Sequence, residues 1–173
     1  RLKPQNQQAL LIKKHKEMNS QDFMNEAVKL AKSNLESLKG GPFGAVVVKD
    51  GKIVGRGFNS VTSLNDPTAH AEVMAIRDAC KNLESFQLDG CEIYSSCEPC
   101  PMCLGAIYWS RPARLYFAAS REDAARAGFD DSYIYEQIPL APEIRDLPTV
   151  KLDAAGAIKV FEAWNNTDSK TLY

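Results

Sequence analysis

Two short groups of metal-binding residue types, about thirty positions apart, constrain the fold of this chain more than any other feature. His70-Ala71-Glu72 begins one predicted helix, and Pro99-Cys100-Pro101-Met102-Cys103 begins another. Cysteines at i and i+3 project from the same side of a first helical turn, so both sulfurs can reach one metal ion. If His70 binds the same ion, the two helix starts must meet in space.

Hydrophobic periodicity predicts the elements around these motifs. The expected elements are a helix capped by Ser20 and ended by Gly40-Gly41-Pro42, strands at Phe43–Lys49 and Ile53–Phe58, a helix from Asp66-Pro67-Thr68 to about Asn82, a strand at Cys91–Ser96, a helix at Cys100–Ser110, and strands at Arg114–Ala118 and near Thr149–Asp153, with a last helix from about Ala157 to Trp164. Asp50-Gly51 predicts a two-residue hairpin turn. The later alternation of strands and helices predicts parallel crossovers. The fold class is therefore α/β, a three-layer α/β/α sandwich around a mixed, mostly parallel five-stranded sheet.

Length and composition indicate one globular domain. The chain has 173 residues, of which 45% are hydrophobic and 25% charged, values typical of a packed domain. Residues 1–17, rich in Lys and Gln, are expected to be an extension before a natural start at Met18, so that the domain covers residues 18–173 and His15 is solvated. We find no apolar run near the roughly 18 residues of a membrane span and no apolar secretory segment. These features predict a cytoplasmic protein without a membrane partner.

Charge and cysteine usage narrow the classes of partner. The formal net charge is −1 and the pI is near 6.2, whereas nucleic-acid-binding domains usually carry a basic surface. A small-molecule substrate is therefore expected, and no nucleic acid. Cys97, Cys100 and Cys103 are spaced too tightly for an ordinary disulfide framework, which favours reduced thiols and a metal. Cys80 and Cys91 are expected to be small buried hydrophobes, and packing is also favoured for Cys97.

The ligand count favours a catalytic zinc ion. His70, Cys100 and Cys103 would hold one Zn²⁺ per subunit and leave the fourth tetrahedral position open for water. Zinc lowers the pKa of a bound water from about 15.7 to about 7, and Glu72 can carry the proton to a ring nitrogen and then to the departing amine. Together, H-x-E and P-C-x-x-C match the signature of zinc nucleobase deaminases. A structural zinc site completed by another cysteine is the alternative, but it leaves Glu72 unexplained.

With these motifs in place, the chain resembles the cytidine/deoxycytidylate deaminase-like zinc superfamily and, within it, the bacterial guanine deaminases. The resemblance runs from Met18 to Tyr173 and rests on GGPFGAVVVKDG, NDPTAHAEVMAIR, SCEPCPMCLGAIYWSRP and AGFDDSYIY. Several branches share the first three in part. Relatives that act on tRNA adenosine tend to carry a small Gly-Ser-containing segment where this chain has Phe129-Asp130-Asp131. The resemblance implies hydrolytic deamination of guanine to xanthine and ammonia.

The same resemblance implies a set of substrate contacts. These residues are Asn59, Ala71, Asp131, Phe43, Trp109 and Tyr173. Asn59 would hydrogen-bond the base, Asp131 would contact the guanine edge, and the two aromatic side chains Phe43 and Trp109 would line its apolar faces. The resemblance also implies a homodimer in which the C-terminal segment closes over the site and can come from the partner subunit. As residues alone, an aromatic on a strand or helix is more often core, and Asn59 is equally compatible with a turn.

Three other functions stay open on the sequence. The motif does not distinguish attack at C2 of guanine from attack at C4 of cytosine or C6 of adenine, so a tRNA adenosine deaminase is the first alternative. A deaminase of another base or nucleoside, such as cytosine or guanosine, is the second. A zinc-binding module without catalysis is the third.

Overall fold

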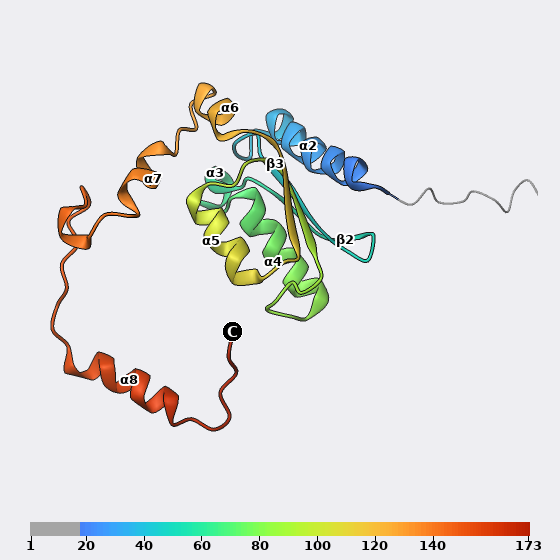
Figure 1. Cartoon of the computed structure of the whole chain (residues 1–173). Helices are drawn as coiled ribbons and strands as arrows, with labels where there is room; N and C mark the ends of the chain where they lie inside the picture. Colours follow the sequence, from blue (N-terminus) through green and yellow to red (C-terminus); the bar gives the residue numbers. More distant parts are fainter. Residues whose placement is uncertain (1–17) are drawn as a thin grey trace, which may run out of the picture.

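The computed structural model describes residues 18–173, which form a four-stranded sheet covered by helices and followed by an extended C-terminal region (Figure 1). The strands are β1 (Gly44–Lys49), β2 (Lys52–Phe58), β3 (Glu92–Cys97) and β4 (Arg114–Ala119). The helices are α2 (Ser20–Ser37), α3 (Val61–Leu64), α4 (Ala71–Leu83), α5 (Pro101–Ser110), α6 (Arg121–Arg126), α7 (Ser132–Gln137), the 3-10 helix η1 (Pro142–Ile144) and α8 (Ala155–Asn165). The expectations for residues 1–17, including the domain boundary at Met18 and a solvated His15, lie outside the described residues.

The hairpin turn between β1 and β2 is confirmed. Asp50 and Gly51 both have positive φ, at 49° and 71°, as a two-residue turn that matches the strand twist requires. The register shifts by one residue between Val47 and Val48, which leaves Val54 of β2 without a partner, and the pairing then continues to Lys49 and Lys52 beside the turn. β1 and β2 are therefore a local antiparallel hairpin.

The prediction of a mostly parallel sheet is wrong. In the described part of the chain the strand order is β2-β1-β3-β4; β1 runs antiparallel to both β2 and β3, and only β3 and β4 are parallel. The hairpin places β1 between β2 and β3. The crossover through α4 consequently passes over β1, so that the parallel strands it joins are not neighbours. The crossover through α5 does join neighbours and gives the one parallel pair.

Helices cover both faces of the sheet, so the predicted three layers are confirmed. On one face, Phe23 of α2 packs against Val46, Val48 and Tyr94. On the other face, the buried apolar residues come from β1, β3, α4, α5 and the loop before β3; they are Ala45, Val47, Ala71, Ala75, Ala79, Leu88, Cys91, Ile93 and Ile107. Alternate residues of β1 thus enter the two cores, as the period of a strand requires.

Two glycines of β2 allow a close approach of α4. A Cβ on Gly57 would lie 2.1 Å from the backbone oxygen of Ala71, and a Cβ on Gly55 would lie 2.5 Å from that of Ala75. Both neighbours are backbone atoms of a packed helix, which have little freedom to move. The glycines therefore set the distance between β2 and α4, and with it the position of the helix start that carries His70 and Glu72.

Two helices begin at positions other than those predicted. Asn19, not Ser20, caps α2 and forms a reciprocal capping box with Asp22, because an Asn side chain at this position reaches the N3 amide. The segment expected to start the next helix instead forms a turn in which the Asp66 carboxylate accepts from the Thr68 amide at 2.8 Å. Helix α4 starts at Ala71 with His70 as its N-cap, so His70 lies at the helix end.

The C-terminal region leaves the body of the molecule and curves around it (Figure 1). The expected helix near Ala157–Trp164 is confirmed as α8. The strand expected at Thr149–Asp153 is absent, and those residues have no regular secondary structure. A strand needs the edge of a sheet as a partner, and this segment lies away from β4 (Figure 1). Among residues 18–173 the sheet therefore has four strands, where five were predicted. No helix in residues 18–173 has the length and apolar character needed to cross a membrane.

Candidate active site

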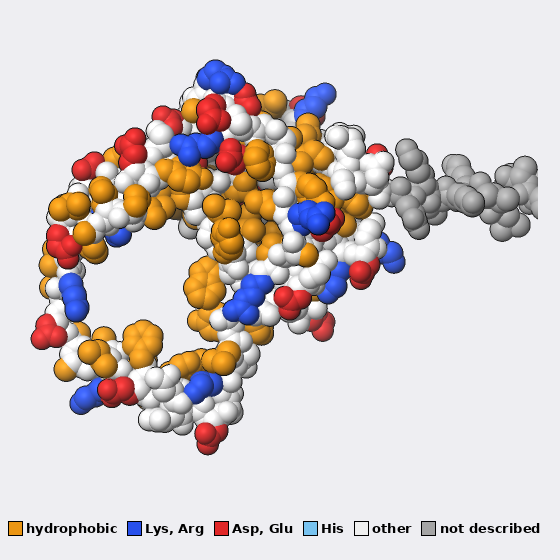
Figure 2. Space-filling view, in the orientation of Figure 1, with side chains coloured by type: hydrophobic (Ala, Val, Ile, Leu, Met, Phe, Trp, Pro, Cys, Tyr) orange, Lys and Arg blue, Asp and Glu red, His pale blue; other side chains and the backbone are white. Residues whose placement is uncertain are grey.

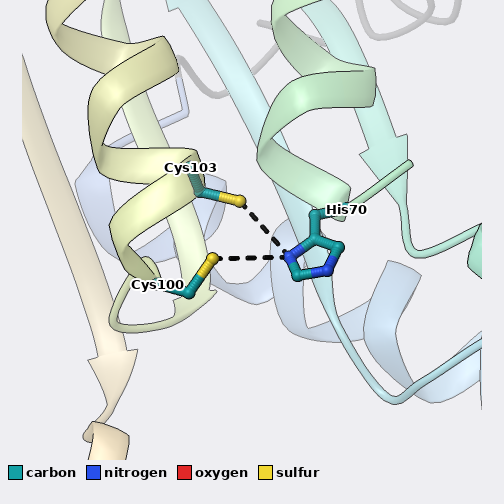
Figure 3. Close-up of side chains that lie close together, drawn as sticks. All are labelled: His70, Cys100 and Cys103. Carbon is teal, nitrogen blue, oxygen red and sulfur yellow. Dashed lines mark hydrogen bonds between the residues drawn. The ribbon is translucent and has the colours of Figure 1, made fainter. Parts of the chain in front are cut away.

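The two helix starts meet and bring three metal-ligand side chains together (Figure 3). The His70 Nδ1 atom lies 3.5 Å from the Sγ atoms of both Cys100 and Cys103, and all three ligand atoms lie within 4.8 Å of one another. His70 is the N-cap of α4, Cys100 is the N-cap of α5, and Cys103 lies in the first turn of α5. One imidazole and two thiols at this separation fit the donor set and tetrahedral size of a zinc site with an open position.

The electrostatics of this ligand group also suit a metal. A hydrogen bond from the Cys103 thiol, together with His70, lowers the pKa of Cys100 to about 4. The same hydrogen bond and burial raise the pKa of Cys103. The contact with Cys100 raises the pKa of His70. Cys100 is thus a thiolate at neutral pH, and the partial positive charge of the α5 N-terminus stabilises it further.

Glu72 lies beside the ligand group and is almost completely buried, at 6% exposure. The Ser95 hydroxyl donates a hydrogen bond of 2.9 Å to Glu72 Oε1. Burial raises the pKa of Glu72, whereas hydrogen bonds from its own backbone and from Ser95 act in the opposite direction. A buried carboxyl with a raised pKa next to a metal-binding group has the property that a general acid–base needs, because it holds a proton more readily than an exposed carboxyl does.

A cavity of about 470 Å³ opens directly onto these residues. Its wall contains His70, Glu72 and Cys100, together with polar, charged and apolar residues from other parts of the chain. The other lining residues are Gly41, Phe43, Asn59, Val61, Thr62, Pro67, Cys97, Glu98, Met102, Arg121, Ala124, Phe129, Asp130, Asp131 and Ile134. This volume is in the range of small-molecule sites.

Asn59 lies in the cavity wall at the end of β2 and is held by several hydrogen bonds. Its Oδ1 atom accepts from the backbone amides of Gly41, at 3.1 Å, and Val61, at 3.3 Å. Its backbone oxygen accepts from the Asn34 side-chain amide at 2.6 Å. Because Oδ1 is occupied by backbone donors, the side-chain NH₂ group is the part of Asn59 available to a ligand. A fixed donor of this kind can bind a ring nitrogen or carbonyl oxygen.

Asp131 lines the same cavity from the loop before α7. Its side chain is 18% exposed, and its Oδ1 atom lies 4.0 Å from Nε of Arg121. Burial raises the pKa of Asp131, and the charge of Arg121 opposes this effect. Phe43 lies in the wall as well, with its ring at 4.9 Å from the Phe129 ring in an edge-to-face arrangement. The cavity therefore combines a carboxylate, an amide and an aromatic wall.

Three residues expected to contact a substrate do not line this cavity with their side chains. Trp109 is 66% exposed, because it lies on the opposite side of α5 from the buried Ile107. Its ring lies 6.0 Å from that of Tyr173, and both residues line a second cavity, of about 420 Å³, beside α8. Ala71 is fully buried in the core, although its N–H belongs to a helix start and has no acceptor within α4. Within one chain, the side chains of Trp109 and Tyr173 do not line the main cavity, so their contact with a substrate stays a prediction.

The three cysteines outside the ligand group have two different settings: Cys80 and Cys91 lie in the core, and Cys97 lies in the cavity wall. All five cysteines are free thiols. Cys91 is fully buried and Cys80 is partly buried in the core around α4, and burial raises the pKa of both thiols. Cys97 is also buried, but it lines the cavity as well, and burial raises its pKa to about 11. Cys97 is therefore a neutral thiol in the cavity wall.

Sequence reasoning missed several residues of the cavity, including Glu98, Arg121 and Phe129. Glu98 directly follows β3, and Arg121 comes two residues after β4. Ligands of α/β proteins bind beyond the carboxyl ends of parallel strands. This rule, applied to the predicted strands at Cys91–Ser96 and Arg114–Ala118, would have indicated both charged residues. Phe129 has no such signal, because it reaches the cavity only through the path of the loop after α6.

The chain belongs to the cytidine and deoxycytidylate deaminases, since residues 17–119 match the zinc-binding region of that family. It is 53% identical to the guanine deaminase of Bacillus subtilis (strain 168) over 156 residues, which cover 90% of this chain and all of that protein. The X-ray structure of B. subtilis guanine deaminase matches with a TM-score of 0.88. A solved guanine deaminase from Nitrosomonas europaea matches 65% of each chain with 34% identity and a TM-score of 0.62. A tRNA-specific adenosine deaminase from Aquifex aeolicus is 45% identical over 59% of this chain and 67% of its own length.

Proposed function

We propose that this chain hydrolyses guanine to xanthine and ammonia. The observation that carries the proposal is that Asn59, Glu72 and Asp131 line one cavity with the His70–Cys100 side of the ligand group. The similarity to a guanine deaminase spans 90% of the chain, whereas the similarity to a tRNA adenosine deaminase spans 59%. The first relation supports guanine as the substrate, and the second makes tRNA adenosine the alternative.

His70, Cys100 and Cys103 would hold the zinc ion, which supplies the acidity that makes water a nucleophile at neutral pH. Glu72 then accepts the proton of the attacking water. Hydrogen bonds from Ser95 and from the Glu72 backbone hold this carboxyl beside the ligand group, and the carboxyl then carries the proton to a ring nitrogen. In the second half of the reaction, Glu72 takes the proton of the hydroxyl group now on C2 and delivers it to the exocyclic nitrogen. The bond between C2 and this nitrogen then breaks, ammonia leaves, and the C2 carbonyl of xanthine forms. One water is consumed and one ammonia released in each turnover.

Asn59 and Asp131 orient the base for this reaction. The Asn59 amide donates to an acceptor on the purine, and the Asp131 carboxylate accepts from ring and amino N–H groups. A site that hydrogen-bonds its substrate through buried polar groups rejects analogues that leave those groups unpaired. This arrangement favours guanine over adenine and cytosine, which present different patterns of donors and acceptors.

The test is ammonia release from the zinc-loaded protein with guanine, guanosine, adenine, cytosine and cytidine at equal concentrations. We expect kcat/KM for guanine to exceed the others by at least about 100-fold, the scale of discrimination that lost hydrogen bonds produce. Faster turnover of cytosine or adenine would contradict the proposal. A gel-shift measurement with tRNA at modest salt tests the alternative, because binding to a polyanion would leave a salt-dependent complex.

We also propose that the chain is a homodimer in which the C-terminal segments are exchanged. Every residue of α8 is exposed, including Phe161 at 71%. A lone helix of this length is marginal in water without a packed face. Figure 2 shows apolar side chains on the side of this region that faces the body, across an open space. Exchange between two copies would cover α8 and the exposed face of α5 in both chains at once.

Analytical ultracentrifugation at several protein concentrations tests the dimer. We expect a species of twice the 19.1 kDa chain mass. A chain truncated before α8 should sediment as a monomer. A full-length chain that remains monomeric at the highest concentration would contradict the dimer.

We propose a cytoplasmic location for this chain. Cys100 and Cys103 belong to the candidate metal site, a use of cysteine that needs reduced thiols, and reduced thiols are typical of the cytosol. Fractionation of cells that express the chain, followed by immunodetection, tests this location. Recovery of the chain outside the cytosolic fraction would contradict it.

A further inference from the structure

Arg121 is the one Lys or Arg side chain among the described residues that line the main cavity. The acidic lining residues are Glu72, Glu98, Asp130 and Asp131. Burial raises the pKa of Glu72 and of Asp131, whereas hydrogen bonds from Ser132 lower the pKa of Asp130. Arg121 is therefore the one guanidinium in the lining that can oppose the effect of burial on Asp131.

Three contacts hold Arg121 in place. It is the first residue of α6, and its backbone N–H donates to Glu98 Oε2 at 3.2 Å. Its guanidinium carbon lies 4.2 Å from the centre of the Tyr135 ring, a cation–π contact. Its Nε atom lies 4.0 Å from Asp131 Oδ1. The side chain is thus clamped between an aromatic ring and a carboxylate at the wall of the cavity.

The guanidinium of Arg121 acts mainly on the Asp131 carboxyl. Burial and the charges of Cys100 and Asp130 raise the pKa of Asp131, and Arg121 is the strongest group that lowers it. The charge of Asp131 in turn raises the pKa of Tyr135 on α7, after the larger effect of burial. An ionised carboxylate accepts hydrogen bonds at both oxygens, whereas a protonated one turns part of this capacity into a donor. Asp131 therefore recognises purine N–H groups only when it is charged.

We propose that Arg121 is a positioning residue that holds the Asp131 carboxylate charged and directed at the bound purine. The inference rests on the proposed deamination of guanine. Arg121 acts through Asp131 and not by its own contact with the substrate. Stacking on Tyr135 fixes the plane of the guanidinium, which a lysine ammonium cannot reproduce. Arg121 therefore contributes both its positive charge and its fixed orientation to the position of Asp131.

A kinetic double-mutant cycle tests the coupling. Arg121→Met should raise KM for guanine about tenfold, which corresponds to about 1.4 kcal/mol, while kcat falls by less than about threefold. Arg121→Lys should recover part of this loss, because it restores the charge but not the stacking. In an Asp131→Asn background, Arg121→Met should change KM by less than about twofold, since contacting residues that act together are not additive. Full additivity would overturn the proposal.

Arg126→Met is the matched control. Arg126 lies on the same short helix and also forms an ion pair with an aspartate, Asp123, but it is outside the cavity. The Arg126→Met substitution should leave KM, zinc content and the melting temperature near those of the unmodified chain. An equal effect of Arg121→Met and Arg126→Met on KM would show a general effect of charge on this helix and would overturn the role of Arg121.

A measurement without substrate separates this inference from the proposed function. Carbon-13 NMR titration of Asp131 in the zinc-loaded protein should show a higher pKa in Arg121→Met and no change in Arg126→Met. If this shift is seen and guanine is not turned over, the pairing stands and the substrate assignment fails. If guanine is turned over and the pKa of Asp131 is unchanged by Arg121→Met, the inference fails and the substrate assignment stands.

Discussion

Glu72 is the residue whose surroundings most directly suit proton transfer. It is buried beside the two thiols and receives a hydrogen bond from Ser95. Desolvation disfavours its charged form, while the hydrogen bond favours it. These opposed effects keep the carboxyl able to exchange a proton, which a fully solvated glutamate with its ordinary low pKa does less well near neutral pH.

Glu72→Ala should abolish most turnover without loss of metal. We expect kcat on guanine to fall by at least about 100-fold, the usual contribution of a positioned general acid–base. Zinc content measured by mass spectrometry should remain near one per chain, because Glu72 is outside the ligand group. Substantial activity in the zinc-loaded variant would exclude Glu72 as the proton carrier.

Ser95→Ala should shift the pH dependence of the reaction. The hydrogen bond from Ser95 lowers the pKa of Glu72, so its removal raises that pKa. Glu72 accepts a proton only above its pKa, and the acidic limb of kcat/KM should therefore move to higher pH. Ser96→Ala is the control, because Ser96 instead accepts from the Gly44 amide at 3.0 Å. The prediction would be contradicted if the acidic limb of kcat/KM did not move in Ser95→Ala. It would also be contradicted if the limb moved equally in Ser96→Ala.

At the scale of elements, the site is a junction between the starts of α4 and α5. The N-caps of these helices are His70 and Cys100, and both free helix ends direct N–H groups toward the same point. The close approach of α4 to β2 at Gly55 and Gly57 holds one side of the junction. A metal ion at this point would link two segments that are far apart in the chain and would stabilise the fold by binding only the folded state.

Removal of zinc should therefore lower stability as well as activity. At a free zinc concentration 100 times the Kd, binding contributes about 2.7 kcal/mol, and its loss should lower the melting temperature by roughly 5 to 10 °C. Cys100→Ala should behave like the chelated protein and retain little zinc. The control is Cys80→Ala, because Cys80 lies on α4 outside the ligand group. Wild-type zinc stoichiometry in Cys100→Ala would show that the ligand assignment is wrong.

At the scale of the whole molecule, the C-terminal region stands out because in a single chain its helix α8 packs against no other described element. Tyr173 contacts Trp109, and α8 lies away from the sheet (Figure 1). The main cavity has no lining residue beyond Ile134 within its own chain. A C-terminal segment from a second copy could close this cavity and exclude bulk water from the reaction.

Deletion of residues 169–173 should lower kcat/KM for guanine at least tenfold, or about 1.4 kcal/mol, and leave zinc content and the melting temperature nearly unchanged. Wild-type kinetics would show that the segment has no part in catalysis. Mixed dimers test whether the segment acts in the partner subunit. A truncated chain with intact Glu72, combined with a full-length Glu72→Ala chain, should regain activity if the segments are exchanged. No recovery would show that the segment acts within its own chain.

The sequence alone determined the ligand group, the hairpin turn, the three layers and α8. The turn and α8 depend on residue types within a few positions, whereas the ligand group and the layers follow from the order of the motifs and elements along the chain. His70, Cys100 and Cys103 lie at helix starts, where backbone geometry directs their side chains together. Only the tertiary structure decided the antiparallel setting of β1, the missing strand at Thr149–Asp153, the outward face of Trp109, and the entry of Phe129 into the cavity. These features depend on which sheet edges and helix faces are free when distant segments pack, and short-range periodicity carries no information about that choice.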